Sequence, residues 1–151
     1  MFFNEWNILV VDDERDIVDL IAYNLKKEGY DVSCAFNGEE ALLKASQKPD
    51  LVILDVMMPL LDGFETCRRL KADPKTSHIP VIFLTARSTE PDEVIGLELG
   101  ADDFIQKPIS PRKLLARVKT VFRRLDQTVD EPKEPAVITV GRIEIDRTTY
   151  P

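Results

Sequence analysis

Two short apolar runs each lead directly into acidic residues, and this feature most constrains the fold. Residues 8–11 run into Asp12 and Asp13, and residues 51–54 run into Asp55. Buried parallel strands are nearly continuous apolar runs, and their carboxyl ends meet at one edge of the sheet. Carboxylates gathered there repel by roughly 4 kcal/mol per close pair at an effective dielectric constant near 20. Such a cluster persists only with a cation, a cationic neighbour or a shifted pKa, so we predict a functional site at this edge.

The whole chain alternates between strand-like and helix-like stretches. Apolar runs predict strands at 7–11, 31–36, 50–54, 80–84 and 103–106. Amphipathic stretches predict helices at 14–28, 38–47, 63–72, 91–99 and 111–125. This alternation predicts an α/β fold, a doubly wound five-stranded parallel sheet with helices on both faces.

Local signals refine two of these helices. Ser110 is expected to cap the last helix, because serine is a preferred residue before the first helical turn. The first helix is expected to turn one apolar stripe toward the core, formed by Ile17, Leu20, Ile21 and Leu25.

Composition narrows the class of protein. The 151 residues are 44% apolar and 31% charged, which is typical of a globular domain. A net charge of −7 argues against nucleic-acid binding by this chain alone. No run approaches the ~20 apolar residues of a membrane span, and the N-terminus has no leader-like pattern, so we expect a cytoplasmic protein that does not contact the membrane. Cys34 and Cys67 lack metal-ligand spacing and are expected to be reduced thiols.

The last part of the chain differs from the rest. Residues 126–135 are polar and contain prolines, which predicts a linker after a domain at 1–125. Apolar residues then mostly alternate with polar ones in 136–151, and Gly141 with Arg142 marks a turn between two short strands. An isolated hairpin is marginal in water. We therefore expect the chain to end inside a second domain, although a short natural tail is the alternative.

Five short motifs follow one another at the predicted strand ends. They are VDDE at 11–14, LDVMMP at 54–59, LTAR at 84–87, GADDF at 100–104 and KP at 107–108. Together they resemble the receiver domain of bacterial two-component response regulators (CheY-like), over about residues 6–125. This resemblance implies the flavodoxin-like strand order 2-1-3-4-5.

The resemblance also implies a phosphoryl-transfer site. Asp55 would accept a phosphoryl group from a phosphohistidine on a sensor histidine kinase, forming an acyl phosphate. Asp12, Asp13, Asp55 and the backbone carbonyl of Met57 would hold Mg²⁺. Lys107 would pair with the phosphoryl oxygens.

Two further residues match positions that respond to the phosphoryl group in receiver domains. Thr85, at the end of the fourth strand, would turn its hydroxyl toward the phosphoryl group. Phe104 would turn inward as Thr85 moves, although related chains usually carry tyrosine at this position. A cis peptide bond is expected between Lys107 and Pro108, where its cost is only about 0.5–1 kcal/mol.

Each of these residues, taken singly, has an ordinary structural explanation. Asp13 is equally suited to capping a helix, and Phe104 to filling a core. Thr85 alone is most often a strand-end hydroxyl and Lys107 a solvated charge, while His78 is expected to be a loop residue without a catalytic role. The ordered set as a whole favours the receiver interpretation.

A dimer surface follows from the same resemblance, formed by the fourth helix, fifth strand and fifth helix (the 4-5-5 face). Its three charge pairs would be Asp103 with Arg117, Asp102 with Arg124, and Glu93 with Lys113. The last pair reverses the signs usual in the family, so complementarity survives across a homodimer, and chains with the usual polarity would be repelled. The alternative is a set of solvated charges worth about 0–1 kcal/mol each. Ile109 also stands where related chains often have phenylalanine.

The residues flanking the site suggest a long-lived phosphoryl group. Met57 lies two residues after Asp55, and Arg87 lies two residues after Thr85. Neither carries a carboxylate or amide suited to orienting an attacking water. We therefore predict slow loss of the phosphoryl group.

Three classes of function use an acidic site of this kind. We favour a phosphorylation-controlled response regulator that binds DNA through its missing C-terminal domain, because residues 136–151 resemble the start of the OmpR/PhoB winged-helix domain. The alternative is a stand-alone receiver that acts through a phosphorelay or a protein partner. A Mg²⁺-dependent phosphatase is disfavoured, because Met57 stands where such enzymes carry a second acid, so the chain is not expected to be an enzyme.

Overall fold

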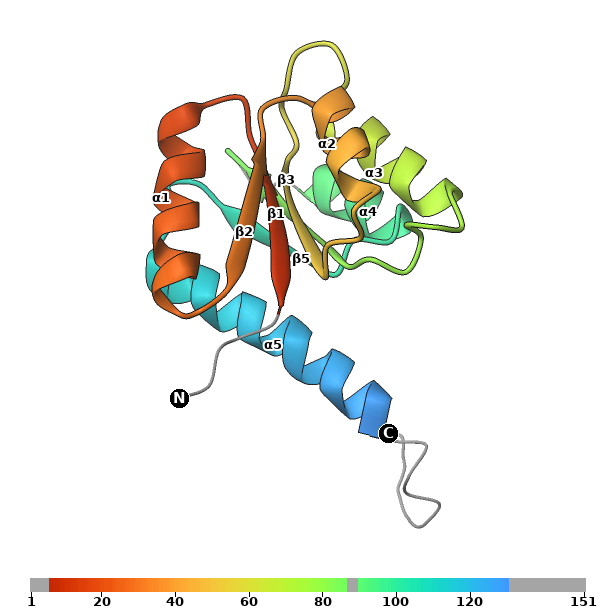
Figure 1. The fold of residues 1–151 in the computed structure, drawn as a ribbon. Helices are drawn as coiled ribbons and strands as arrows, with labels where there is room; N and C mark the ends of the chain where they lie inside the picture. Colours follow the sequence, from red (N-terminus) through yellow and green to blue (C-terminus); the bar gives the residue numbers. More distant parts are fainter. Residues whose placement is uncertain (1–5, 87–89, 131–151) are drawn as a thin grey trace. The chain divides into compact units, whose positions relative to one another are not determined.

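In the computed structural model, residues 6–86 and 90–130 are described, except for the side chains of 90–92 and 127–130 (Figure 1). Arg87, half of the predicted linker (131–135) and the predicted start of a second domain therefore lie outside the described residues. The chain divides into two compact units, 1–117 and 118–151.

A single five-stranded parallel sheet forms the centre of the first unit. Its strands have the order β2-β1-β3-β4-β5, which confirms the predicted flavodoxin-like fold. The strands are β1 (Asn7–Val11), β2 (Asp31–Ala35), β3 (Leu51–Asp55), β4 (Val81–Thr85) and β5 (Asp103–Gln106). All residues of β3 and β4 are buried, because both faces of these strands are covered by helices.

Helices connect the strands and cover both faces of the sheet. They are α1 (Arg15–Lys27), α2 (Gly38–Ala45), α3 (Gly63–Ala72), α4 (Glu90–Glu98) and α5 (Pro111–Asp130). Helix α1 lies on one face, and α2, α3 and α4 lie on the other (Figure 1). On the second face Leu54 and Phe83 of the sheet belong to one apolar cluster with Ala41 of α2 and Cys67 of α3. No described helix is both long and apolar enough to cross a membrane.

The predicted core face of α1 was partly wrong. Val18, Ile21 and Leu25 are fully buried, but Leu20 is 38% exposed. The buried stripe is thus rotated by one position, because Val18 is a second apolar residue on the first turn and is the one that packs against the sheet.

The predicted capping role of Ser110 is confirmed at the start of α5, since the Ser110 hydroxyl accepts a hydrogen bond from Lys113 N at 3.4 Å.

Helix α5 is longer than predicted. It was expected to end at 125 but continues to Asp130, into the predicted linker. Residues 126–130 are mostly polar, but they contain neither proline nor glycine, so nothing in them stops a helix before Pro132. In the second unit, the described residues belong to this helix, and Val118, Val121 and Phe122 are buried.

Candidate functional site

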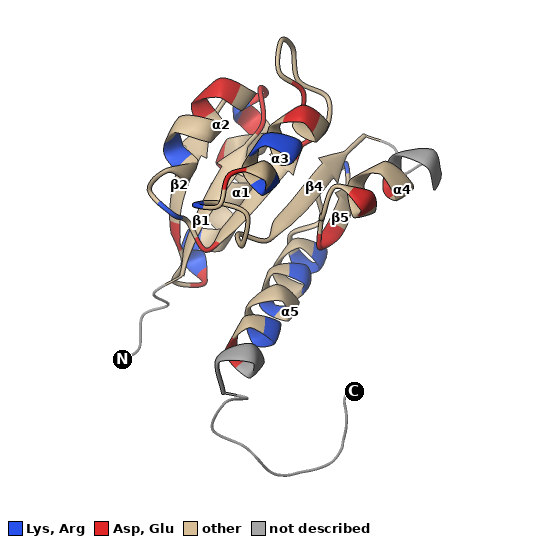
Figure 2. Ribbon diagram, turned by 90° about the vertical axis from the view of Figure 1, so that its right-hand side faces the viewer, with Lys and Arg blue, Asp and Glu red and all other residues tan. Residues whose placement is uncertain are grey.

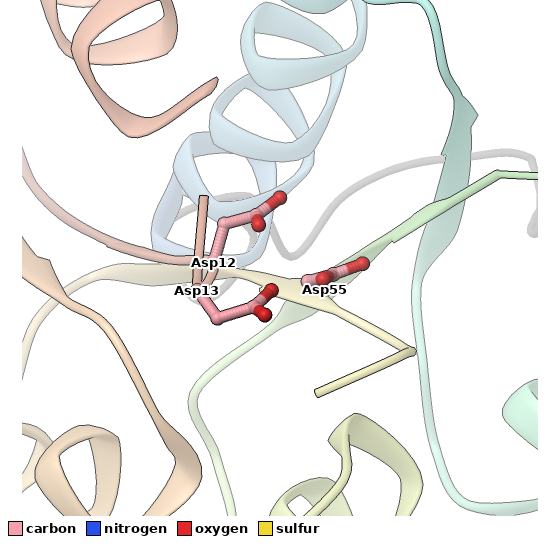
Figure 3. A group of neighbouring side chains, drawn as sticks. All are labelled: Asp12, Asp13 and Asp55. Carbon is pink, nitrogen blue, oxygen red and sulfur yellow. The ribbon is translucent and has the colours of Figure 1, made fainter. Parts of the chain in front are cut away.

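The sheet brings the three aspartates together as predicted. Val11 is paired with Leu54, so the residues that follow β1 lie beside Asp55 at the end of β3. Asp12, Asp13 and Asp55 each offer a carboxylate oxygen, and these atoms all lie within 4.8 Å of one another (Figure 3). Asp12 and Asp55 are buried, whereas Asp13 is exposed. The site is therefore anchored in the core and open to solvent on one side.

Asp12 has one satisfied and one unsatisfied oxygen. Its Oδ1 accepts a hydrogen bond from Glu14 N at 2.9 Å. Its Oδ2 is buried without a well-formed hydrogen bond to any described residue, although Lys107 Nζ lies 3.0 Å away. Helix α1 begins at Arg15, so Glu14 and not Asp13 occupies the capping position. The alternative role of Asp13 as a helix cap is therefore wrong.

Lys107 reaches the site from the end of β5. Its Nζ lies 3.0 Å from Asp12 Oδ2, 3.4 Å from Asp55 Oδ1 and 3.5 Å from Glu14 Oε1. The peptide bond to Pro108 is cis, as predicted. Lys107 N also donates a hydrogen bond to the carbonyl of Thr85 at 2.8 Å, so the backbone of the lysine is held against the end of β4.

Burial and charge shift the pKa values of these groups. Burial raises the pKa of Asp55 to about 7, and the negative charge of Asp12 adds to the effect, while Lys107 opposes it. Burial also raises the pKa of Asp12. Burial lowers the pKa of Lys107, but its contact with Asp12 and the charges of Asp55 and Glu14 outweigh that effect, so the net shift is upward.

The donor set fits a divalent cation. When all three carboxylates are ionised, the single ammonium group of Lys107 leaves two negative charges uncompensated. The unsatisfied Oδ2 of Asp12 and the exposed carboxylate of Asp13 are oxygen donors of the kind that hard divalent cations prefer. The cluster can thus hold a metal ion next to the carboxylate of Asp55.

A glycine that sequence reasoning missed sets the position of Asp55. Gly63 begins α3, and a Cβ on it would lie 2.2 Å from the carbonyl oxygen of Asp55. Its amide donates to the carbonyl of Val56 at 2.9 Å, and Asp62 caps the helix through Glu65 N at 2.8 Å. The available signal was a glycine in the first turn of a helix, where this residue is otherwise unfavourable.

The loop between β3 and α3 exposes two apolar side chains near Asp55. Met57 is 72% exposed, and its amide lies 3.4 Å from Asp55 Oδ1. Leu60 is 95% exposed and has a φ of 68°, in the left-handed region that side chains with a Cβ rarely adopt. No sequence pattern predicts a left-handed backbone at this leucine.

Replacing Leu60 with asparagine should raise the free energy of unfolding by roughly 0.5–1 kcal/mol, because asparagine tolerates the left-handed conformation better and almost no buried surface is lost. Urea denaturation would measure this. Leu43→Asn is the matched control, since Leu43 is 75% exposed in the helical conformation of α2 and should lose stability instead. An equal effect at both positions would contradict the role of backbone strain.

The predicted sensing residues occupy the neighbouring strands. Thr85 ends β4 and is 4% exposed. Phe104, on β5, is partly buried, and its ring centroid lies 5.5 Å from that of Phe83. This packing is compatible with both the core role and the switch role of Phe104, so the switch role stays a prediction.

Five of the six predicted dimer residues, Glu93, Asp102, Asp103, Lys113 and Arg117, line one cavity of the first unit. Arg117 Nη1 donates to both carboxylate oxygens of Asp103 at 2.9 and 2.8 Å within the same chain. Asp102 accepts a hydrogen bond from Val81 N at 3.1 Å. Glu93 and Lys113 line a cavity of about 420 Å³ that Asp102, Asp103, Phe104 and Arg117 also line. Arg124 belongs to the second unit. Figure 2 shows acidic residues on α4 and basic residues along α5.

Known proteins match both the sequence and this fold. The family model for the response regulator receiver domain matches residues 8–119. The alkaline phosphatase synthesis transcriptional regulatory protein PhoP of Bacillus subtilis (strain 168) is 56% identical over 118 residues, which cover 78% of this chain and 48% of PhoP. This chain therefore spans about half the length of that relative.

Solved structures agree. DrrB, a Thermotoga maritima OmpR/PhoB homolog, is 37% identical and has a TM-score of 0.72, over 80% of this chain and 54% of DrrB. The Vibrio cholerae chemotaxis protein CheY4 is 31% identical with a TM-score of 0.75, over 78% of this chain and 99% of CheY4. These matches confirm the prediction of a signalling domain rather than an enzyme. With its acidic cluster at the end of a 2-1-3-4-5 sheet, the chain belongs to the family of response regulator receiver domains.

Proposed function

We propose that Asp55 accepts a phosphoryl group from the phosphohistidine of a sensor kinase in a reaction that needs Mg²⁺. The observation that carries this proposal is the buried Asp55 carboxylate, held 3.4 Å from the Lys107 ammonium beside two further carboxylates. A carboxylate oxygen would attack phosphorus, the phosphorus–nitrogen bond of the donor would break, and an acyl phosphate would form.

Each residue of the site has a distinct role in this step. Asp12, Asp13, Asp55 and the backbone carbonyl of Met57 would hold Mg²⁺, which neutralises charge on the phosphoryl oxygens when bound. Lys107 would exchange its contact with Asp55 for a contact with the phosphoryl group. The hydroxyl of Thr85 would donate a hydrogen bond to the same group. The apolar side chain of Met57 leaves no group there to orient a water for hydrolysis, which supports a long-lived phosphoryl group.

Intact-mass analysis tests this proposal. The protein is incubated with Mg²⁺ and acetyl phosphate, and wild type should gain one phosphoryl group that Asp55→Asn lacks. Asp31→Asn is the control, because Asp31 is an exposed carboxylate at the start of β2. Addition of EDTA should abolish the adduct in wild type. An adduct that persists in Asp55→Asn, or none on folded wild type, would refute the assignment.

The output of the complete protein is proposed to be transcriptional control in the cytoplasm. PhoP is named as a transcriptional regulatory protein, and DrrB as an OmpR/PhoB homolog, and each is about twice as long as the matched part. A net charge of −7 disfavours DNA contacts by this fragment, so DNA binding would belong to a C-terminal domain. The alternative, a stand-alone receiver, would signal through a protein partner.

Phosphorylation is proposed to promote a homodimer through α4, β5 and α5. In the proposed twofold interface α4 of one copy would lie against α5 of the other, and complementary charges on the two helices would then favour the dimer. Glu93 on α4 and Lys113 on α5 meet this requirement, and both line the cavity beside Phe104. Asp102, Asp103, Arg117 and Arg124 would supply the other charges of the dimer.

The charge pair gives a matched test. Glu93→Lys should weaken dimers of the phosphorylated protein about tenfold, because two attractive contacts become repulsive. The double variant Glu93→Lys/Lys113→Glu should restore them, since the reversed charges are complementary again. Sedimentation at several protein concentrations measures the dissociation constant. Equal dimerisation of all three proteins would mean that these charges are merely solvated.

A further inference from the structure

The ring of Phe104 has well-defined neighbours on the inner side of β5. Phe104 is paired in register with Phe83 of β4, so both side chains point to the same face of the sheet. Their rings are tilted by 36° with centroids 5.5 Å apart, and Phe83 is fully buried. Phe83 in turn meets Phe64 of α3 edge to face at 5.2 Å. The Phe104 ring thus ends a row of three packed aromatic side chains.

Gly96 of α4 faces the tip of the Phe104 ring. A Cβ on Gly96 would lie 2.3 Å from Cζ of Phe104 and 3.1 and 3.2 Å from its two Cε atoms, and these are the three nearest atoms. Gly96 does not have a left-handed backbone conformation, so its φ does not require glycine. Glycine inside a helix is also less favourable than alanine. The close approach of the ring is therefore the reason for glycine at this position.

The Phe104 ring borders a second space that it could occupy after leaving the contact with Gly96. Phe104 also lines the cavity of about 420 Å³ on the α4, β5 and α5 surface, together with Leu97. This space is large enough for a phenyl ring, although a ring placed there would lie against the charged residues Glu93, Lys113 and Arg117. Because phenylalanine has no hydroxyl, packing alone decides between the inner position and the cavity.

We propose that Gly96 is a positioning residue that, by lacking a side chain, seats the Phe104 ring against α4 and keeps it out of the cavity on the α4, β5 and α5 surface. The seat is completed on the other side by Phe83. This inference rests on the proposed function, because the cavity lies on the surface proposed to dimerise. The contact between Gly96 and the Phe104 ring would thereby control how often this surface is available for dimerisation.

A mutant cycle tests the contact itself. Gly96→Ala should lower the melting temperature of the otherwise wild-type protein, because the added methyl group meets the ring. In a Phe104→Leu background the same change should raise the melting temperature, since the ring tip is gone and only the better helix propensity of alanine remains. A change of the same sign in both backgrounds would overturn the proposal.

Two further readouts separate positioning from general stability. Nuclear Overhauser contacts between the Phe104 ring and the α-protons of Gly96 should be present in wild type, and Gly96→Ala should lose the close contact between ring and helix. Dimerisation of phosphorylated Gly96→Ala should be at least tenfold weaker by sedimentation. A ring that stays packed on residue 96, or a dissociation constant equal to that of wild type, would refute the proposal.

Failure of the proposed function gives a different result. Intact mass reports whether Asp55 is phosphorylated in each variant, and Gly96→Ala should form the same adduct as wild type. Absence of the adduct from wild type would refute phosphoryl transfer but leave the mutant cycle valid for the seat. If Gly96→Ala fails to fold, a folded Gly96→Ala/Phe104→Leu supports the seat, and a double variant that also fails to fold refutes it.

Discussion

The Asp55→Asn variant should be more stable than wild type by roughly 2 kcal/mol at pH 8 without divalent cations, and nearly equal to it at pH 4. Burial raises the pKa of Asp55 to about 7 in the folded protein, whereas an aspartate in an unfolded chain has a pKa near 3.9. Between these values the folded protein holds a proton that the unfolded chain has released, so stability falls as the pH rises. Above about pH 7 the penalty is complete.

The expected stabilisation of Asp55→Asn at pH 8 is the difference between two opposing contributions. A shift of about three pKa units corresponds to roughly 4 kcal/mol, which is an upper bound. This shift already includes the opposing effect of Lys107, which lies 3.4 Å from Asp55. The asparagine amide must itself be desolvated at this buried position, and this cost offsets part of the gain. Roughly half of the bound is therefore expected to remain.

Urea denaturation in EDTA at pH 4 and pH 8 measures the effect. Asp31→Asn, an exposed carboxylate variant, should change stability by less than about 0.5 kcal/mol at both pH values. Addition of Mg²⁺ at pH 8 should stabilise wild type more than Asp55→Asn, because a ligand carboxylate is lost. If Asp55→Asn were stabilised equally at both pH values, the buried charge of Asp55 could not be the cause of the stabilisation.

The Gly63→Ala variant should lose about 3 kcal/mol of stability, near the upper end of overpacking effects. The new methyl group would lie 2.2 Å from the carbonyl oxygen of Asp55 and 2.8 Å from Cα of Val56. Both are backbone atoms at the end of a buried strand, so neither can move aside as a flexible side chain does. The backbone of Asp55 must therefore shift, or α3 must begin later.

Chemical denaturation measures this loss, and intact mass after incubation with acetyl phosphate should show slower adduct formation. Glu39→Ala places the same alanine in the first turn of α2 at an exposed position, where a change within about 0.5 kcal/mol is expected. Equal stabilities for the two variants would mean that the loop after Asp55 accommodates a side chain without strain.

The sequence predicted the fold and the acidic cluster because both depend on strand ends. Apolar runs that lead into Asp12 and Asp55 fix which residues share the sheet edge, and parallel pairing then brings them together. The position of Lys107 also followed, since its motif ends the fifth strand. These features arise from the order of elements along the chain, which a sequence displays directly.

Features that depend on distances between elements were not predictable in the same way. Gly63 and Gly96 are required by the approach of Asp55 O and the Phe104 ring, and neither approach is visible without the packed structure. The rotated core face of α1 arose because Val18 and Leu20 are both apolar and only the sheet distinguishes them. The end of α5 was missed because polar residues 126–130 suit a helix as well as a linker.

The ion pair between Asp103 and Arg117 has a consequence for the salt dependence of assembly. Both partners already neutralise each other within one chain, so a dimer that pairs them across the interface exchanges one contact for an equivalent one. Such an exchange contributes little net free energy and responds weakly to ionic strength. The Glu93 and Lys113 charges and the desolvation of apolar side chains on α4 would then drive the proposed assembly, and Val94, Ile95 and Leu97 are 46%, 43% and 58% exposed there. The apolar part should appear as a negative change in heat capacity on assembly, whereas the Asp103–Arg117 pair should add little to its salt dependence.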